Sequence, residues 1–302
     1  MKNILITGGT GLVGQRLTAL LQQKNYQVSY LSRSRNTSGA IQTYQWDIPQ
    51  GKIDEEALQK ADYIIHLAGA GVADKSWTAE RKKVILESRT QSTLLLYSEL
   101  KRLDLHPKAF ISASAIGYYG LDTGDALLYE DSQAGNDFLA QVTQAWEDAI
   151  DKVSTLGIRT AKLRIGIVLS NHGGALPKIV QPIRYGLGAA LGTGKQYMSW
   201  IHIDDLCRMF IYALENQALE GVYNAVASSP VSNAEFTQVA AQVLHRPLLL
   251  PAVPAFALKM ALGEMAGIVL GGNRVSNDKI KKSGFSFQFE HLQEALSDLY
   301  PG

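Results

Sequence analysis

Residues Thr7–Gly14 read TGGTGLVG, and this stretch decides the fold. It follows an apolar run, Ile4-Leu5-Ile6, and it precedes a segment in which leucines recur at helical spacing, at Leu12, Leu17, Leu20 and Leu21. A strand, a glycine-rich turn and an amphipathic helix in this order predict the first unit of a parallel α/β sheet.

The glycines follow the spacing Gly8-x-x-Gly11-x-x-Gly14. The first permits a tight turn, the second lets the backbone approach a pyrophosphate, and the third lets the helix pack closely on the strand. Amides at the helix start would then face phosphates. The candidate contact residues are Gly8, Thr10, Gly11, Leu12, Val13 and Gly14. The alternative is a glycine-rich turn that binds nothing.

The rest of the chain alternates short apolar runs with helical patterns. The expected strands are Asn3–Thr7, Gln27–Leu31, Ile41–Trp46, Tyr63–Leu67, Ala109–Ala113, Arg159–Ile165 and Gly221–Asn224. We therefore predict a Rossmann-type doubly wound parallel sheet in residues 1–165, with contributions from about 200–225, and a smaller C-terminal α/β substrate lobe in 166–302. The apolar stretch Ala252–Leu270 contains Pro254, Lys259 and Glu264, so we interpret it as a buried or capping helix rather than a membrane span.

Composition limits the function classes. The 302 residues carry a formal charge of +1, so no global field attracts nucleic acid or an anionic membrane, although a local basic patch is allowed. The single cysteine, Cys207, excludes an internal disulfide and a thiolate metal cluster, and no ligand spacing predicts a metal site. The short apolar run after Met1 does not resemble a signal peptide. We expect a cytoplasmic monomer or homodimer that acts on a small molecule, without a nucleic-acid or membrane partner.

The end of the second expected strand predicts the type of dinucleotide. It reads Ser32-Arg33-Ser34-Arg35, and no Asp or Glu lies between Thr7 and Asp47. A carboxylate there would bind the ribose hydroxyl of NAD, whereas arginine accepts the 2′-phosphate of NADP, so NADP is favoured. The alternative is a solvated basic loop. Asp47 either receives the adenine amino group or caps a turn.

The fourth expected strand closes with HLAGAG, residues 66–71. Its small residues allow the backbone to lie against the nicotinamide ribose and pyrophosphate, which makes Leu67, Ala68, Gly69 and Ala70 candidate contacts. We interpret His66 as a structural residue of the strand.

Together these segments resemble the extended short-chain dehydrogenase/reductase superfamily, in its NAD(P)-dependent epimerase/dehydratase branch. More narrowly, the chain is similar to the atypical "epimerase family protein" subgroup. The motifs that carry the resemblance are TGGTGLVG, HLAGAG, SASAIGYYG, WIHIDDL, Trp77 with Arg81-Lys82-Lys83, Ser88-Arg89, Gly221–Ala227, Asn233–Phe236, Leu262–Ala266 and Arg274-Val275. The resemblance covers essentially the whole chain. It implies a Rossmann domain with NADP and a C-terminal substrate lobe, and it implies no particular substrate.

The resemblance also implies a catalytic serine at the end of the fifth strand, followed on the next helix by a tyrosine and a lysine four residues apart. Ser112 and Ser114 end the fifth expected strand, and Ser114 matches the serine. The helix over 137–143 contains neither tyrosine nor lysine. Tyr97 and Lys101 have the required spacing, but they lie on the wrong crossover and read as a solvated helix end.

Substitutes must come from elsewhere in the chain. Tyr118 or Tyr119 offers a phenol over the expected nicotinamide site, or else packs as an aromatic wall. Lys82 or Lys83, with Arg89 on the same helix, either supplies the missing positive charge or is simply solvated, and Lys83 is our catalytic candidate. Glu130 is a possible proton acceptor.

Further candidates concern cofactor contacts and the second half of the chain. Arg89, Ser112 and Arg164 are candidate cofactor contacts. We interpret His202 as structural, with Asp204 and Asp205 capping a helix that starts at Leu206.

The expected function is an NADP-dependent oxidoreductase or epimerase-type enzyme that acts on an unknown small carbonyl or sugar-like substrate and lacks the tyrosine–lysine dyad. The alternative is a catalytically reduced NADP-binding protein with a redox-sensing or regulatory role.

Overall fold

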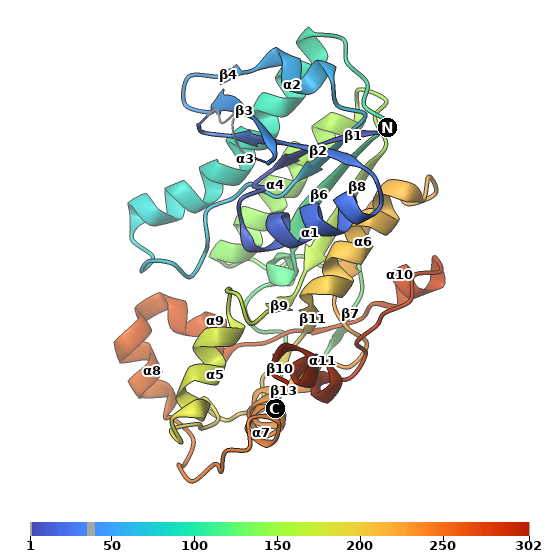
Figure 1. The fold of residues 1–302 in the computed structure, drawn as a ribbon. Coiled ribbons are helices and arrows are strands. Elements are labelled where there is room, and N and C mark those ends of the chain that lie inside the picture. The colour runs from blue at the N-terminus through green and yellow to red at the C-terminus, as the bar shows by residue number, and fades with distance from the viewer. Residues whose placement is uncertain (1, 35–39, 302) are drawn as a thin grey trace.

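The computed structural model describes residues 2–34 and 40–301. Its main sheet has eight strands in the order β12-β8-β6-β5-β1-β2-β3-β4 (Figure 1). The strands are β1 Asn3–Thr7, β2 Gln27–Ser32, β3 Gln42–Asp47, β4 Lys52–Ile53, β5 Tyr63–His66, β6 Ala109–Ala115, β8 Thr160–Ile165 and β12 Gly221–Ala225. All pairs are parallel except the edge pair β3–β4. The Rossmann-type fold is confirmed, and each of the seven expected strands ends within two residues of its prediction.

The central strands are apolar on both faces because helices cover both sides of the sheet. Ile4, Leu5, Ile64, Phe110 and Ile111 have no exposed surface. Helices α1 (Leu12–Gln23) and α6 (Ile203–Glu215) pack together on one face, and α3 (Ala79–Arg102) and α4 (Phe138–Ser154) pack together on the other (Figure 1). The short helix α2 (Glu55–Gln59) lies beside the β4 edge.

Strand order reverses between β1 and β5, since β1 pairs with β2 on one side and with β5 on the other. The carboxyl ends of parallel strands next to such a reversal form the crevice in which open α/β sheets bind ligands. The glycine turn after β1 and the HLAGAG loop after β5 both lie at this edge.

The C-terminal lobe has its own apolar cluster, which includes Leu169, Trp200, Phe236 and Leu296. Its short elements are β9 Ile167–Leu169, α5 Leu176–Arg184, β10 Tyr197–Met198, β11 Trp200–His202, β13 Val231–Ser232, α7 Asn233–Val243, α8 Ala255–Leu262, η2 Gly263–Met265, α9 Ala266–Leu270, β14 Arg274–Val275, α10 Asp278–Lys282 and α11 Leu292–Leu299. Strand β14 pairs with β7 (Leu127–Leu128), which follows η1 (Ile116–Tyr119).

Two local predictions are wrong. The stretch 252–270 does not form one buried helix, because Gly263 has a φ of +59° and ends α8, and no residue of α8 is buried. Helix α6 begins at Ile203 rather than Leu206, and the side chain of His202 caps it. No helix within the described residues has the length and apolar character of a bilayer span.

Asp205 therefore has a different role from the expected helix cap. Its carboxylate is fully buried and accepts hydrogen bonds from the amides of Gln288 and Phe289, each at 2.9 Å. It also pairs with Arg208 at 2.7 Å. The Asp205 carboxylate thus holds the segment before α11 against α6, a helix that packs on the main sheet.

We predict that Asp205→Ala lowers the free energy of unfolding by about 3 kcal/mol, because it removes a fully buried carboxylate and leaves two part-buried amides and the Arg208 guanidinium without their acceptor. Urea titration at pH 7 measures this change. Asp148→Ala on the exposed side of α4 is the control and should change stability by less than about 0.5 kcal/mol. An Asp205 variant as stable as the Asp148 control would contradict the assigned role.

Candidate active site

The glycine turn, residues Gly8–Gly14, is packed too closely for side chains. Gly8 has a φ of +71°, and a Cβ atom there would lie 2.9 Å from the carbonyl carbon of Leu67. A Cβ atom on Gly14 would lie 2.5 Å from the carbonyl oxygen of Gly8. Helix α1 begins directly after Gly11, without a side-chain cap or an acidic residue in its first turn. Its first amides therefore suit an anion, since the start of a helix leaves them without internal partners.

The basic end of β2 is only partly described. Arg33 is exposed, and its carbonyl accepts a hydrogen bond from Gln45 at 3.2 Å. Arg35 lies outside the described residues. The carboxylate of Asp47 accepts from the amide of Gln50 at 3.0 Å, which supports the turn-capping alternative for Asp47.

His66 is structural, as the sequence indicated, and its hydrogen bonds define its tautomer. Thr93 donates its hydroxyl proton to the carbonyl of Arg89, so Nε2 of His66 must donate to Thr93 Oγ1, 3.0 Å away. Nδ1 then accepts from Thr7 Oγ1 at 2.7 Å. Burial lowers the pKa of His66 to about 3, with a further contribution from the nearby charge of Arg89.

The side chain of Thr7 connects His66 to the loop after β5. Its hydroxyl oxygen accepts from the amides of Leu67 and Ala68, each at 3.2 Å. The neutral imidazole of His66 therefore fixes the hydroxyl that holds the HLAGAG loop against the glycine turn.

Arg89 lies beneath this loop as a poorly solvated cation. Its Nη1 donates to the carbonyl oxygens of Ala70 at 3.0 Å and Ile85 at 2.9 Å, and its guanidinium lies 5.2 Å from the ring centre of Trp146. Burial, with the nearby charge of Arg81, lowers the pKa of Arg89 to about 10. In residues 2–34 and 40–301 no carboxylate forms an ion pair with Arg89. A desolvated cation without an acidic partner suits an anionic ligand.

Ser114 belongs to a buried polar network around a carboxylate that the sequence analysis missed. Its Oγ donates to Glu147 Oε1 at 2.5 Å. Arg164 binds the same carboxylate with both arms, from Nε to Oε1 at 2.8 Å and from Nη2 to Oε2 at 2.9 Å. The exposed fractions are 2% for Ser114, 5% for Glu147 and 3% for Arg164, so all three side chains are shielded from water.

A sequence signal for Glu147 existed. It lies next to Trp146 on the apolar face of α4, and a charged residue there must have a buried partner. It also follows Thr143 by one helical turn, and Thr143 lies beside Gly117 at the end of β6. The expected tyrosine and lysine are absent from this helix, but the same helix supplies a carboxylate.

The aromatic candidates contact the same arginine. Tyr119 donates its phenol proton to Asn224 Oδ1 at 2.7 Å and accepts from Arg164 Nη1 at 3.1 Å. Burial raises the pKa of the Tyr119 phenol. The guanidinium of Arg164 lies 3.4 Å from the ring centre of Tyr118. Arg164 Nη1 also donates to the carbonyl of Glu130 at 3.0 Å, and the Glu130 carboxylate accepts from the amide of Asn224.

The structure thus brings Ser114, Tyr118, Tyr119 and Arg164 together, and it does not bring Lys83 to them. The Lys83 side chain is 71% exposed and lies 3.8 Å from Glu87 on its own helix. Lys82 instead binds Glu264 at 2.6 Å and lies over the ring of Phe138.

Ser112 and His202 form hydrogen bonds with the main chain of their own segments. The hydroxyl of Ser112 is buried and donates to the main chain at Ala113. The structural interpretation of His202 is confirmed, because Nδ1 accepts from the amide of Asp204 and the ring packs against Phe289. Nowhere in the described ranges do three or more His, Cys, Asp or Glu residues form a group able to hold a metal ion.

Fold and glycine turn define a Rossmann-type α/β protein. Residues 4–225 match the model of the NAD dependent epimerase/dehydratase family, and residues 253–299 match a domain of unknown function, DUF1731. The chain belongs to the NAD dependent epimerase/dehydratase family. It is 38% identical over 299 residues to Epimerase family protein YfhF of Bacillus subtilis, covering 98% of this chain and 97% of that protein.

Two solved structures share the fold over 99% of this chain. Human epimerase family protein SDR39U1, crystallised with NADPH, is 30% identical with a TM-score of 0.88, and the match covers 99% of that chain. The nucleoside-diphosphate sugar epimerase of Corynebacterium glutamicum is 32% identical with a TM-score of 0.80, and the match covers 58% of that longer chain.

We predict that His66 makes folding stability dependent on pH. Its pKa is about 3 in the folded chain and about 6.5 when unfolded, so below pH 6.5 only the unfolded chain binds the proton. The free energy of unfolding should therefore fall by up to about 1.4 kcal/mol per pH unit between pH 6.5 and pH 3.

The measurement is urea unfolding at pH 7, 6 and 5. His66→Gln should make the pH slope shallower, whereas His106→Gln at an exposed position should leave it as in the parent. An unchanged slope in the His66 variant would show that a neutral buried imidazole is not present.

Proposed function

We propose that the protein is an NADP(H)-dependent oxidoreductase or epimerase-type enzyme that acts on a small carbonyl, alcohol or sugar-like substrate. The observation that carries this proposal is the 2.5 Å hydrogen bond from Ser114 to Glu147, with Arg164 holding the carboxylate. It would supply a proton path from the same helix on which the resemblance implies a tyrosine and a lysine.

The residues present fit a dinucleotide phosphate. The uncapped amides at the start of α1 would bind the pyrophosphate, and the lack of a side chain on Gly14 lets the helix start pack against the turn, where a Cβ atom would lie 2.5 Å from the carbonyl oxygen of Gly8. Arg89 would add a cation beside the Ala68–Ala70 backbone, and Arg33 with Arg35 would bind the 2′-phosphate. The human relative at 30% identity was crystallised with NADPH, which supports the choice of NADP over NAD.

The proton path follows from which atoms donate. The hydroxyl proton of Ser114 points to Glu147, so the lone pairs of Oγ remain to accept a hydrogen bond from a substrate hydroxyl. During alcohol oxidation, Oγ takes the substrate proton while its own proton moves to Glu147 Oε1, and the oxygen electron pair forms the carbonyl. The hydride that leaves the alcohol carbon, or is added to the carbonyl carbon, is the chemistry that NADP(H) would supply when bound. In carbonyl reduction, Glu147 returns the proton through Ser114.

Arg164 and Tyr119 would act as positioning residues. Arg164 keeps the Glu147 carboxylate in one orientation through two hydrogen bonds, so that Oε1 stays in line with Ser114. The Tyr119 phenol is buried and donates to Asn224, so its part is to hold Arg164 rather than to give a proton to substrate.

A second candidate function is an NADP-binding protein that senses redox state without turnover. The burial of Ser114, at 2% exposed, and the mutual satisfaction of its network favour it. It requires different affinities for NADP⁺ and NADPH, because a ligand pair with equal affinity shifts no equilibrium. Titration calorimetry with both forms separates it from catalysis when combined with the turnover assay below.

We predict that Arg33→Gln with Arg35→Gln raises the Kd of NADPH about tenfold or more and leaves the Kd of NADH within about twofold, because the lost interactions reach the 2′-phosphate alone. Calorimetric titration of both cofactors measures this. The control is Lys24→Gln, whose ammonium lies by Glu215 at the far end of α1. Equal losses for NADPH and NADH would contradict the assignment.

We predict that Glu147→Gln and Ser114→Ala each lower kcat at least about a hundredfold and change the Kd of NADPH by less than about threefold, because they remove a proton path and not a cofactor contact. The assay is NADPH oxidation or NADP⁺ reduction over a panel of carbonyls, alcohols and nucleotide sugars.

Asp148→Asn is the matched control for Glu147→Gln. It is the next residue on α4, and it lies on the exposed side of that helix. Turnover that survives Ser114→Ala would overturn the proposed path, and absence of turnover across the panel by a chain that binds NADPH would favour the sensing function.

A further inference from the structure

One surface of the C-terminal lobe gathers most of the exposed large apolar side chains of the described residues. Eight of them lie in this lobe: Tyr185, Leu187, Leu248, Leu249, Leu250, Phe256, Met260 and Leu262. Leu249 is 77% exposed and Met260 is 81% exposed. Exposed apolar surface of this extent usually marks an interaction site.

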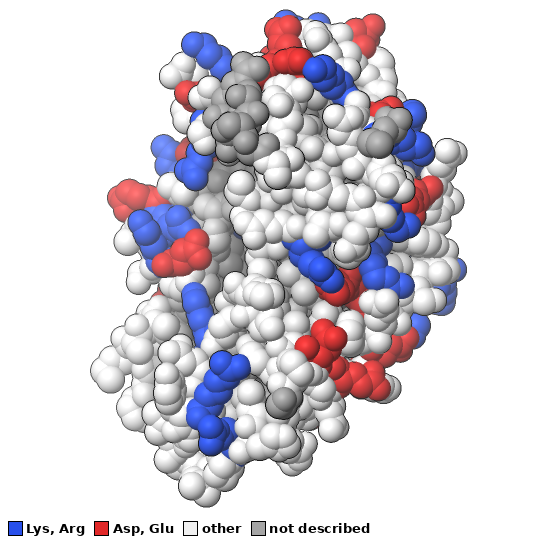
Figure 2. All heavy atoms as spheres, in the orientation of Figure 1, with Lys and Arg blue, Asp and Glu red and all other residues white. Residues whose placement is uncertain are grey.

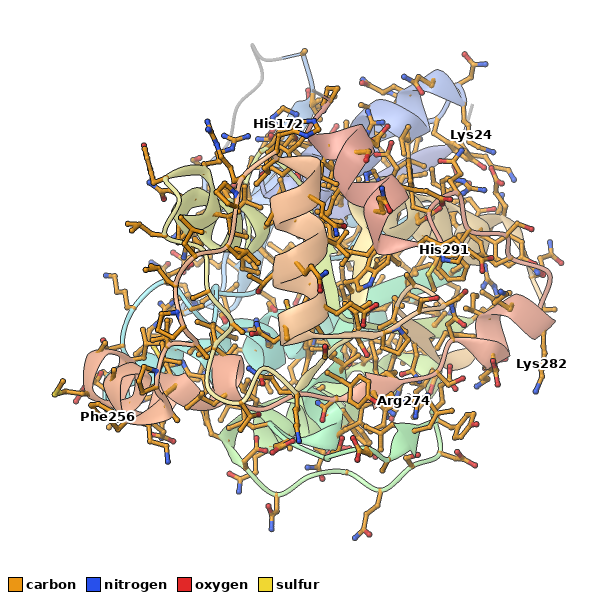
Figure 3. The ribbon with its side chains drawn as sticks, turned by 90° about the horizontal axis from the view of Figure 1, so that it is seen from below. Lys24, His172, Phe256, Arg274, Lys282 and His291 are labelled. Carbon is orange, nitrogen blue, oxygen red and sulfur yellow. The ribbon has the colours of Figure 1, made fainter. Side chains whose placement is uncertain are left out.

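Two of the segments that carry these side chains run side by side. The amide of Val253 donates to the carbonyl of Ala190 at 2.8 Å, and the amide of Gly192 donates to the carbonyl of Val253 at 2.9 Å. The side chain of Leu248 lies against Gly188, and Val253 leads directly into α8. Figure 3 shows Phe256 of α8 at the outer edge of the molecule.

The segments that carry these side chains are rich in cations, and the nearest carboxylate in the sequence after α8, Glu264, pairs with Lys82. Residues 171–203 and 236–263 contain no Asp or Glu, and they contain the cations Lys178, Arg184, Lys195, Arg246 and Lys259. The whole chain has a net charge of +1, so this excess is local. In the space-filling view the lower left of the molecule, around α8, shows a broad area free of charged side chains with basic side chains beside it (Figure 2). We call the eight apolar residues and these five cations the apolar–basic face.

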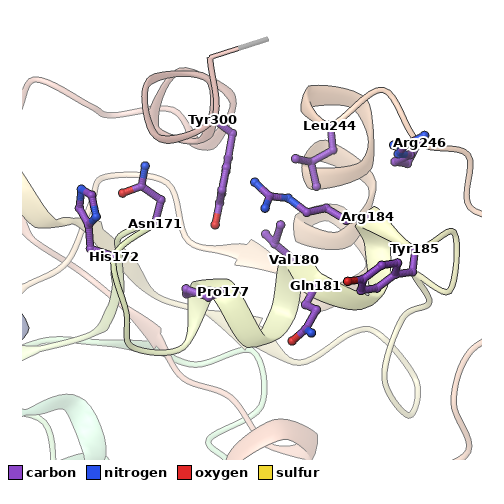
Figure 4. A pocket seen from close by; sticks show the side chains of 10 residues that line it. All are labelled: Asn171, His172, Pro177, Val180, Gln181, Arg184, Tyr185, Leu244, Arg246 and Tyr300. Atoms are coloured by element: carbon purple, nitrogen blue, oxygen red, sulfur yellow. The ribbon is translucent and has the colours of Figure 1, made fainter.

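A cavity of about 910 Å³ opens within the apolar–basic face. Arg184 and Arg246 line it together with Leu244 and Tyr300, and none of the described residues that line it is an Asp or Glu (Figure 4). The guanidinium of Arg184 lies 4.7 Å from the ring centre of Tyr300. Two arginines, neither in an ion pair with a described residue, are suited to hold a phosphate group.

We infer that the apolar–basic face docks on the surface of an anionic lipid bilayer. Arg184 and Arg246 would bind lipid phosphate, while Leu248–Leu250, Phe256 and Met260 enter the acyl boundary. Apolar side chains that protrude among lysines and arginines combine the two attractions that hold proteins at such an interface. The sequence-based expectation of no membrane partner concerned the global charge, and this face is the local basic patch that the global charge allowed.

Charge argues against the most obvious other occupant. A second copy of the chain placed face to face would bring Arg184, Arg246 and Lys259 against the same cations of its partner. The leucines also occupy three consecutive positions, which suits insertion into a fluid phase more than the filling of a shaped pocket.

The test is co-sedimentation of the full chain with vesicles of phosphatidylcholine alone and of phosphatidylcholine with 30% phosphatidylglycerol. We expect at least about tenfold stronger partition to the anionic vesicles at 0.1 M NaCl, and weaker partition at 0.5 M NaCl. Leu249→Ser with Phe256→Ser should reduce partition at least about tenfold, and so should Arg184→Gln with Arg246→Gln.

Val84→Ser with Leu127→Ser is the matched control, since both side chains are exposed outside the apolar–basic face, at 46% and 42%. Near-parental partition of this control supports the inference. Equal partition to both vesicles, or apolar and arginine variants that bind like the parent, overturns it. Light scattering that shows dimers in lipid-free solution, lost in the Leu249 and Phe256 variant, also overturns it in favour of self-association. NADPH affinity in the same variants keeps this outcome separate from the proposed function.

Discussion

The buried ion pair between Arg164 and Glu147 constrains the candidate site more than any other interaction. Removing two opposite charges from water is costly, and the cost is offset only when the geometry is good and the remaining donors and acceptors are satisfied. Here Arg164 bonds to Glu147 with both arms and to Tyr119 and the carbonyl of Glu130, and Ser114 bonds to the carboxylate. Loss of Glu147 would leave Arg164 buried without its ion-pair partner, whereas loss of Arg164 would leave Glu147 with the more distant Lys162, 3.8 Å away.

This pair also orders elements that are far apart in the chain. Arg164 comes from β8, Glu147 from α4, Ser114 from β6 and Tyr119 from η1, and Asn224 of β12 joins through the phenol. The network sets the direction of the Ser114 hydroxyl proton, which the proposed proton path requires. At the neighbouring strands, His66 orders the glycine turn and the HLAGAG loop through Thr7, so two polar networks prepare adjacent parts of one sheet edge.

Much of the fold follows from local sequence. Runs such as Ile4-Leu5-Ile6 predict buried parallel strands, and the glycine spacing predicts the close contacts of Gly8 and Gly14 that the structure contains. The strands β7 and β14 could not be predicted, because two-residue strands whose partners are 147 positions apart (274 − 127) pair only through tertiary packing, as Leu127 does with Arg274. The exposure of α8 was also missed, since its apolar composition predicts burial and only the arrangement of the lobe determines what covers it.

Part of the site was predictable because its residues lie at the ends of predicted strands or directly after them. Ser114, Tyr118, Tyr119 and Arg164 end elements of the sheet edge, so topology brings them together. Glu147 was missed because a family pattern directs attention to an absent tyrosine and lysine. Its place beside Trp146 on the apolar face of α4 indicates a buried charge, and only tertiary packing identifies Arg164 as its partner. The sequence does not distinguish Lys82 from Lys83, although adjacent positions on a helix point in different directions. In the structure Lys82 contacts Glu264 of the C-terminal lobe, whereas Lys83 lies near Glu87 on its own helix.

The most direct test of this account is a crystal structure of the protein with NADPH. We expect the pyrophosphate to bind the amides at the start of α1 and the 2′-phosphate to lie beside Arg33. We expect the nicotinamide to lie within about 4 Å of the Ser114 hydroxyl or of a substrate oxygen bound to it. A cofactor bound with its nicotinamide well away from Ser114, or phosphates that do not touch the glycine turn, would contradict it.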